Sequence, residues 1–332
     1  MAKDFWVHVL AALDRGETVF LAHVVANSRH SPGTRGACLC LHENGKTWGT
    51  IGGGIMEKTL INEGLAALQA ADYPPRLERL HHRQKADGKL SGLTCAGHQT
   101  NLYHICHPSD GPLLKRLVEL LEDDRPGRLT YSRQGLAIDE SHVPDPHSPP
   151  IVVKDADDEN WRVEEELLNW KRVAIIGGGH CGLALSRVMS QLGYTVTVFD
   201  ARPNVFTFCN NSYARHRIVV DDYKEAGDLI SAPLWTHVVV MTSDGASDIR
   251  GLLGVVGKPF PYIGVMGAPA KIQRVVGALR AENIDDDAIE ALYAPIGLPM
   301  TSNTPEEVAI SVASEILQER TRHFSFTGVE AP

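Results

Sequence analysis

The sequence predicts an α/β protein, and three observations lead to this class. Residues 171–200 read as strand, glycine turn, helix and strand, because short β-branched runs flank an amphipathic stretch. Two later apolar runs, 235–241 and 261–265, each end in a polar or glycine-containing loop. The first half instead mixes helices with strands joined by turn signals. We therefore expect a C-terminal Rossmann-like, doubly wound parallel sheet plus an N-terminal α+β domain.

Length, charge and cysteine use narrow the class of protein further. A chain of 332 residues favours two domains, which we place at 1–168 and 169–332. The net charge of −9 argues against a nucleic-acid partner. The six cysteines are scattered, which favours a reducing cytoplasm. Neither a signal peptide nor an apolar run of about 18 residues is present, so no membrane association is expected.

The predicted elements follow the apolar periodicity of the chain. Asn44-Gly45 indicates a hairpin, and Thr304-Pro305-Glu306-Glu307 is a capping box that begins the last helix. Helices are expected at 3–14, 55–71, 113–123, 183–192, 271–282 and 306–320. Strands are expected at 18–26, 37–42, 48–51, 76–81, 100–106, 129–131, 161–165, 173–176, 195–199, 217–220, 235–241 and 261–265.

Three glycines between strand 173–176 and the following helix suggest a phosphate site. Gly177, Gly179 and Gly182 fit the pattern G-x-G-x-x-G. The first allows a tight turn, the second lets the backbone approach a pyrophosphate, and the third lets helix and strand pack closely. The start of the helix offers free N–H groups and the positive end of a dipole. The alternative is that these glycines serve packing alone.

Polar residues should surround this site at the carboxyl edge of the sheet. Asp200 ends the next strand, where a carboxylate could accept hydrogen bonds from a ribose diol. Asp244 follows the buried strand 235–241. His180 could bond a ligand at the helix start, or it could act only as a donor within the turn.

A second glycine loop lies in the N-terminal half. Gly52, Gly53 and Gly54 join a strand to a helix, and such a backbone forms a nest of N–H groups that binds anions. Arg35 lies one hairpin away and could grip a phosphate or carboxylate. Glu57 lies in the first helical turn, where it could also simply complement the dipole. A tight turn without a ligand is the alternative.

Cysteine and histidine gather between residues 95 and 107. Cys95 follows a polar stretch and lies close to Gly97, where an exposed thiol could be functional or a buried one inert. Cys181 in the other glycine loop is the second candidate thiol. The spacing of the cluster fits no usual zinc pair, so no metal site is expected. The cluster comprises Cys95, His98, His104, Cys106 and His107.

Ordered motifs over most of the chain resemble one known family. The N-terminal half contains SPGTRGACL and GTIGGGIME, and the C-terminal half contains GGGHCGLAL, VVVMTSD, YIGVMG, PIGL and TPEEVAISVASEI. This series is similar to the xanthine dehydrogenase accessory proteins, the XdhC/CoxI maturation factors. The chain departs from the family at HSPGTRG, at Cys95-Ala96-Gly97 in place of Cys-Gly-Gly, and at Gly178 and Cys181.

The resemblance implies a maturation chaperone more than a catalyst. Such a protein binds a molybdopterin-type molybdenum cofactor, supports its sulfuration with a cysteine desulfurase, and delivers it to an apo-xanthine dehydrogenase-type hydroxylase. The family also implies a cytoplasmic homodimer. Two other functions stay open: an NAD(P)-dependent oxidoreductase that uses Asp200 for the ribose, and a regulatory protein that senses a nucleotide.

Overall fold

The computed structural model divides the chain into two compact units, one within Met1–Leu168 and one within Asn169–Phe324. No helix in the described part of the chain is long and apolar enough to span a membrane. The structure describes residues 3–28, 30–70, 73–82, 97–145, 148–156, 158–167, 169, 171–301 and 304–323.

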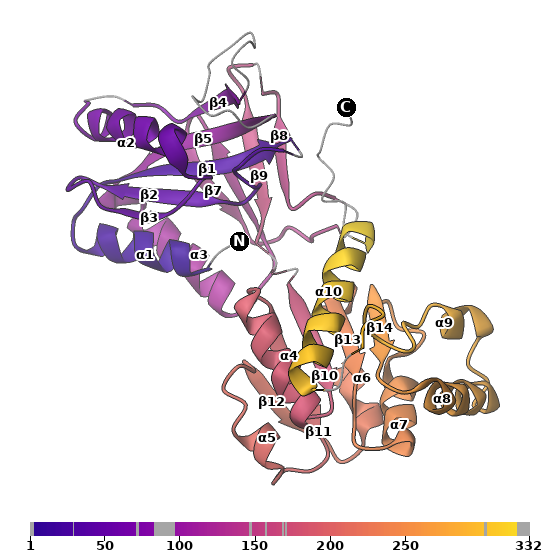
Figure 1. Cartoon of the computed structure of the whole chain (residues 1–332). Helices are drawn as coiled ribbons and strands as arrows, with labels where there is room; N and C mark the ends of the chain where they lie inside the picture. Colours follow the sequence, from indigo (N-terminus) through magenta and orange to yellow (C-terminus); the bar gives the residue numbers. More distant parts are fainter. Residues whose placement is uncertain are drawn as a thin grey trace. The chain divides into compact units, whose positions relative to one another are not determined.

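The N-terminal unit is built on an antiparallel five-stranded sheet with β1 at its centre (Figure 1). Alternate residues of β1 face opposite sides, so Phe20 and Ala22 belong to one core and Val19 and Leu21 to another. A register shift between Val24 and Ala26 marks a bulge in β1. The strand order is β3 (Thr47–Gly49), β2 (Cys38–His42), β1 (Val19–Asn27), β5 (His98–Cys106) and β4 (Arg76–His81).

Helices cover both faces of this sheet. Helix α2 (Gly54–Leu68) packs on the Phe20 face through Met56 and Leu60. Helices α1 (Lys3–Asp14) and α3 (Gly111–Glu122) cover the other face and contact each other. A short 3₁₀ turn, η1 (Pro108–Asp110), leads from β5 into α3. The helices predicted for these stretches are confirmed.

A second, four-stranded antiparallel sheet completes the N-terminal unit. Leu129, Tyr131 and Val163 of this sheet join the same core as α1 and α3. The prediction found β6 and β9 but missed β7 and β8. The strand order is β7 (Gly135–Asp139), β6 (Arg128–Ser132), β9 (Arg162–Glu166) and β8 (Ile151–Lys154).

The C-terminal unit contains five parallel strands with the first strand, β10, in the middle (Figure 1). This order confirms the Rossmann-like sheet, and its direction of winding reverses between β10 and β13. The ends of these two strands therefore form the topological switch point where such sheets bind ligands. The strand order is β12 (His216–Val219), β11 (Thr195–Asp200), β10 (Arg172–Ile176), β13 (Thr236–Val240) and β14 (Tyr262–Val265).

The two faces of the parallel sheet carry different helices. Val173 and Ile175 face a core shared with α4 (His180–Gln191) and α10 (Pro305–His323), which lie side by side (Figure 1). Ala174 and Ile176 face the opposite core. That core contains side chains of η2 (Tyr223–Glu225), α6 (Ala226–Leu229), α7 (Gly245–Val255), α8 (Pro269–Ala281) and α9 (Asp286–Glu290). The short helix α5 (Phe206–Cys209) and the 3₁₀ turn η3 (Pro233–Trp235) lie in connections.

Candidate functional site

The N-terminal glycine loop, residues 52–54, joins β3 to α2 through a backbone that favours glycine. The φ angles are +125° at Gly52, +72° at Gly53 and +69° at Gly54. A Cβ on Gly52 would lie 2.8 Å from the backbone nitrogen of Gly33. The glycine loop therefore packs backbone to backbone against the segment that contains Arg35, and two of the segments singled out from the sequence lie together.

The carboxylate of Glu57 folds back into the N-terminal glycine loop. Its Oε2 accepts hydrogen bonds from the Thr50 hydroxyl at 2.7 Å and from the backbone N–H groups of Ile51 and Gly53, each at 3.1 Å. The Gly53 N–H belongs to the nest predicted to bind an anion, and the Ile51 N–H lies beside that nest. A carboxylate of the protein itself occupies them, so a ligand at the same donors would have to displace Glu57.

A buried amide fixes both N-terminal segments to β5. Gln99 has no exposed surface. Its Oε1 accepts from the Ser31 hydroxyl at 2.9 Å and from the Gly33 N–H at 3.2 Å. Its Nε2 donates to the Ile51 carbonyl at 3.2 Å and to Asn101 Oδ1 at 2.9 Å. Because buried amides are costly unless they are bonded, this network specifies one arrangement of the two segments.

Arg35 is half-buried within its segment. Its backbone N–H donates to Asn27 Oδ1 at 2.9 Å, which fixes the main chain beside it. Burial lowers the pKa of the Arg35 guanidinium, although an arginine keeps its charge at neutral pH. Arg35 therefore supplies positive charge to the N-terminal unit, and its role as an anion ligand stays a prediction.

The C-terminal glycine loop, residues 177–179, leads from β10 into α4. A Cβ on Gly177 would lie 2.3 Å from the Met241 carbonyl oxygen, and one on Gly182 would lie 2.1 Å from the Gly177 carbonyl oxygen. Backbone packing therefore requires both glycines. Gly179 is different: its φ is −73°, and a Cβ there would meet nothing within 4 Å. Among the described residues, no side chain caps α4 at this position.

Asp200 ends β11 and fixes the C-terminal glycine loop. It has no exposed surface, and its carboxylate accepts from the Gly178 N–H at 2.7 Å and the Tyr223 hydroxyl at 3.0 Å. Arg202 donates from its backbone N–H, from Nε and from Nη2 at 2.8–2.9 Å. Burial alone would raise the pKa of Asp200, but these donors outweigh burial and lower it. A ribose diol would have to compete with them.

Two aspartates bracket the start of α7 at the carboxyl end of β13. Asp244 caps the helix: its carboxylate accepts from the Ser247 N–H and hydroxyl, each at 2.9 Å, and these bonds lower its pKa. Asp248 is fully buried and accepts from the Thr242 hydroxyl at 2.6 Å. It also forms an ion pair with Lys271 of α8. The sequence indicated Asp244 but gave no signal for the pairing of Asp248 with Lys271.

Three predicted residues remain, and the structure describes His180 and Cys181. His180 is exposed at the first position of α4. Cys181 is half-buried and packs in the apolar core that includes side chains of α10. Burial raises the pKa of the Cys181 thiol, so it stays protonated at neutral pH, and a protonated thiol is a poor nucleophile and metal ligand. Cys95 lies outside the described residues.

The C-terminal glycine loop therefore leaves the N–H groups at the start of α4 without a described side-chain partner, unlike the N-terminal loop, whose N–H groups bond Glu57. Free N–H groups and the positive end of the α4 dipole meet there at the switch point between β10 and β13. The contacts of Arg202 and Glu57 could not be found from the sequence, because they depend on the direction of a side chain. Gln99 carried no signal, since the strand predicted at 100–106 begins one residue after it and β5 begins at His98.

Comparisons with known proteins agree with this architecture. Residues 173–316 match the family model described as the XdhC Rossmann domain, and residues 12–79 match the model of the XdhC and CoxI family. A crystal structure of a xanthine dehydrogenase from Bacillus halodurans shares the fold with a TM-score of 0.73 and 23% sequence identity. That match covers 100% of this chain and 98% of the other.

Two curated relatives are longer than this chain. "Uncharacterized protein YqeB" of Escherichia coli is 23% identical over 312 residues, which are 93% of this chain and 45% of that protein. A probable xanthine dehydrogenase subunit of Bacillus subtilis is 25% identical over 162 residues, which are 46% of this chain and 43% of that protein. The chain thus spans less than half the length of each. Family models thus match segments in both halves of the chain, and the chain belongs to the XdhC and CoxI family.

Proposed function

We propose that this protein is an accessory factor for a xanthine dehydrogenase-type molybdenum hydroxylase. In this role it binds a molybdopterin-type cofactor, protects it, supports its sulfuration by a cysteine desulfurase, and delivers it to the apo-hydroxylase. Family membership supports the association with such an enzyme, as does the name of the Bacillus subtilis relative. We further expect a homodimer in the cytoplasm.

The observation that carries the proposal is the open start of α4. Molybdopterin bears a phosphate, which in some forms is extended to a dinucleotide with a pyrophosphate. The open space at Gly179 and the absence of a side-chain cap among the described residues leave room for such a group. The N–H groups of a helix start are suitable donors for it. Gly179 and the neighbouring exposed His180 are the residues we expect to contact the phosphate.

The N-terminal glycine loop fits a phosphate less well as it stands. The Glu57 carboxylate already accepts hydrogen bonds from N–H groups of this loop, and it would repel a phosphate placed beside it. We therefore assign the phosphate to the C-terminal glycine loop, and keep Arg35 as a candidate contact for another part of the ligand. The cofactor would supply the molybdenum and its dithiolene, whereas the chain binds and shields it.

An NAD(P)-dependent oxidoreductase is the second candidate function. It would use the same glycine loop for the pyrophosphate, with Asp200 accepting from the ribose. The bonds from Arg202, Tyr223 and Gly178 to that carboxylate are the reason we favour the accessory function. A dehydrogenase of this kind would first have to break some of them.

The test is the pterin and molybdenum content of the full chain, purified without oxygen from a host that makes the cofactor. Wild type should retain near-stoichiometric pterin. Gly179→Asp should lose it, because the new carboxylate caps α4 and repels the phosphate. Gly111→Asp, the same change at the open first position of α3, is the matched control and should retain it. Absence of pterin from wild type, together with saturable NAD(H) binding, would instead favour the oxidoreductase.

A further inference from the structure

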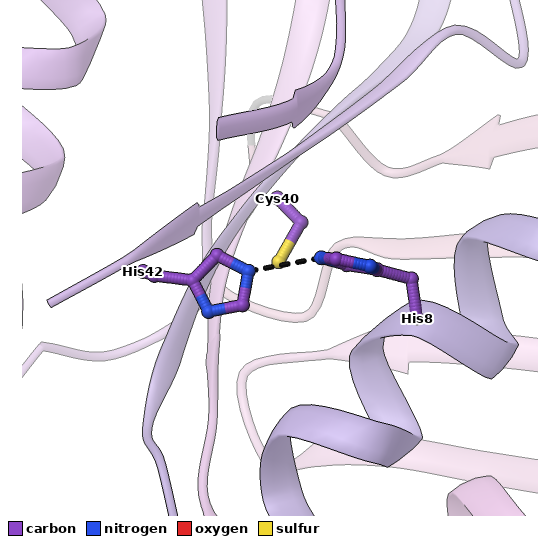
Figure 2. Close-up of side chains that lie close together, drawn as sticks. All are labelled: His8, Cys40 and His42. Atoms are coloured by element: carbon purple, nitrogen blue, oxygen red, sulfur yellow. Dashed lines mark hydrogen bonds between the residues drawn. The ribbon is translucent and has the colours of Figure 1, made fainter. Parts of the chain in front are cut away.

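One face of the N-terminal five-stranded sheet carries an unusual set of cysteines and histidines. Cys38, Cys40 and His42 alternate along β2 and so point to the same side. The strand register places Cys40 beside Leu21 and His42 beside Val19, in the core covered by α1. His8 of α1 points toward Cys40 and His42 from the helix that covers this face (Figure 2). Side chains distant in sequence thus meet at the contact between α1 and β2.

His8, Cys40 and His42 have the geometry of a metal-binding group. Their ligand atoms, two imidazole nitrogens and one sulfur, all lie within 4.8 Å of one another. Nε2 of His8 lies 2.9 Å from Nε2 of His42, and Figure 2 shows the Cys40 sulfur beside that hydrogen bond. Two nitrogens bound to one tetrahedral zinc ion lie about 3.3 Å apart. The rings need to separate by only a few tenths of an ångström.

The surroundings of His42 orient it for this role. Its Nδ1 lies 2.9 Å from Oε2 of Glu17. An ionised carboxylate only accepts hydrogen bonds, so Nδ1 carries the proton and a neutral His42 presents the lone pair of Nε2 to the group. A carboxylate behind the histidine is the usual outer partner of a metal-ligating imidazole. The ring of His8 stacks on Trp48 at 5.3 Å between centroids, which holds it in place.

Burial leaves one coordination position open to solvent. Cys40 has no exposed surface and His42 is 7% exposed, whereas His8 is half-buried. A metal ion would therefore be enclosed on the side of β2, and would keep water as a fourth ligand on the side of α1, where His8 is half-buried. One sulfur and two imidazole nitrogens favour a zinc-like ion over magnesium or calcium, which prefer oxygen ligands.

We propose that His8, Cys40 and His42 form a binding site for a zinc-class divalent ion that ties α1 to the sheet. The Cys40 thiol releases its proton to solvent as the sulfur–metal bond forms. The proton on His8 moves from Nε2 to Nδ1, so each ion bound releases one proton. A similar group on β5, His104 with Cys106 and Asp110, is the weaker site, because the Asp110 carboxylate already accepts from the His107 N–H at 2.8 Å.

The test is a titration of the metal-free, reduced full chain with Co²⁺ in the absence of oxygen, followed by ultraviolet and visible absorption. One ion per chain should give a thiolate-to-cobalt band in the near ultraviolet and the visible bands of a tetrahedral site. Zn²⁺ should abolish both. Cys40→Ser should lose the thiolate band. Cys38→Ser, two residues away on the same strand and face, is the matched control and should keep it.

Two further variants keep the test decisive if Cys40→Ser does not fold. His8→Gln changes a half-buried side chain on the helix surface, and should weaken zinc affinity at least tenfold in calorimetry. Glu17→Gln leaves all three ligands in place and should weaken it about tenfold through His42. Absence of a thiolate band in wild type, its persistence in Cys40→Ser, or its loss only on substitution of Cys106 would overturn the assignment.

Discussion

The N-terminal and C-terminal glycine loops look alike in sequence and differ in what meets their N–H groups. Each joins a strand to a helix of 12 or more residues. In the N-terminal loop the Glu57 carboxylate bonds two N–H groups from within the protein. In the C-terminal loop Asp200 takes the N–H of Gly178, and the first turn of α4 stays uncapped by any described side chain. The same motif can therefore build a closed turn or an open anion site.

The largest effect on stability should come from substitution of Asp200, which fixes the conformation of the C-terminal glycine loop. Asp200→Asn removes a buried carboxylate that accepts hydrogen bonds from Gly178, Arg202 and Tyr223. We expect the loss of these charge-assisted bonds to lower the free energy of unfolding at pH 7 by about 3 kcal/mol, measured by urea denaturation. Asp221→Asn, an exposed carboxylate in the same unit, is the control and should change little.

The pH dependence of this loss follows from the lowered pKa of Asp200. A carboxyl with a lower pKa in the folded state stabilises the protein fully above its ordinary value of about 4, and loses that contribution as pH falls through the folded-state pKa. The difference in the free energy of unfolding between wild type and Asp200→Asn should thus be constant from about pH 5 to 8. In this range the carboxyl is ionised in both the folded and the unfolded state. The difference should shrink below about pH 4. A difference that grew on acidification would contradict this assignment.

A smaller effect is expected when the N-terminal loop loses its internal anion. Glu57→Ala leaves the N–H groups of Ile51 and Gly53 without their acceptor, which should cost about 1–2 kcal/mol. Added sulfate should restore part of this stability by binding the vacated nest, as thermal denaturation would show. Glu63→Ala, on the same helix, should show no sulfate effect. If sulfate stabilised wild type and Glu57→Ala equally, the loop would be open already.

The smallest effect on stability should come from a substitution in the C-terminal glycine loop. Gly179→Asp introduces a residue with a strong preference for the N-cap position, where φ is compatible with any side chain. The free energy of unfolding should stay the same or rise by about 0.5–1 kcal/mol. A clear destabilisation by this variant would mean that the space in front of α4 is needed for the fold itself.

Local signals were enough to predict most of this architecture. The β10–α4–β11 unit was predicted because its strands, glycines and helix follow one another within 30 residues. Strands β7 and β8 were missed because they are short and flank a proline-rich stretch. The reach of Glu57 back to Ile51 and Gly53 depends on a side-chain direction that spacing does not encode.

The candidate metal-binding group of His8, Cys40 and His42 could not be predicted from sequence spacing either. His8 lies on a helix, and Cys40 and His42 lie on a strand 32 residues or more further on. No sequence spacing links them, and only the packing of α1 on the sheet brings them together. The histidines and cysteines between 95 and 107, which are conspicuous because they cluster in sequence, contribute two members of the weaker group.

The most direct test of the account is the binding of inorganic pyrophosphate to the full chain, measured by titration calorimetry. Wild type should bind one pyrophosphate per chain at the start of α4, and Gly111→Asp should bind it equally well. Gly179→Asp should not bind it, although it is folded and at least as stable. Equal binding by Gly179→Asp and wild type, or no binding by wild type, would contradict the assignment of the C-terminal glycine loop as the open anion site.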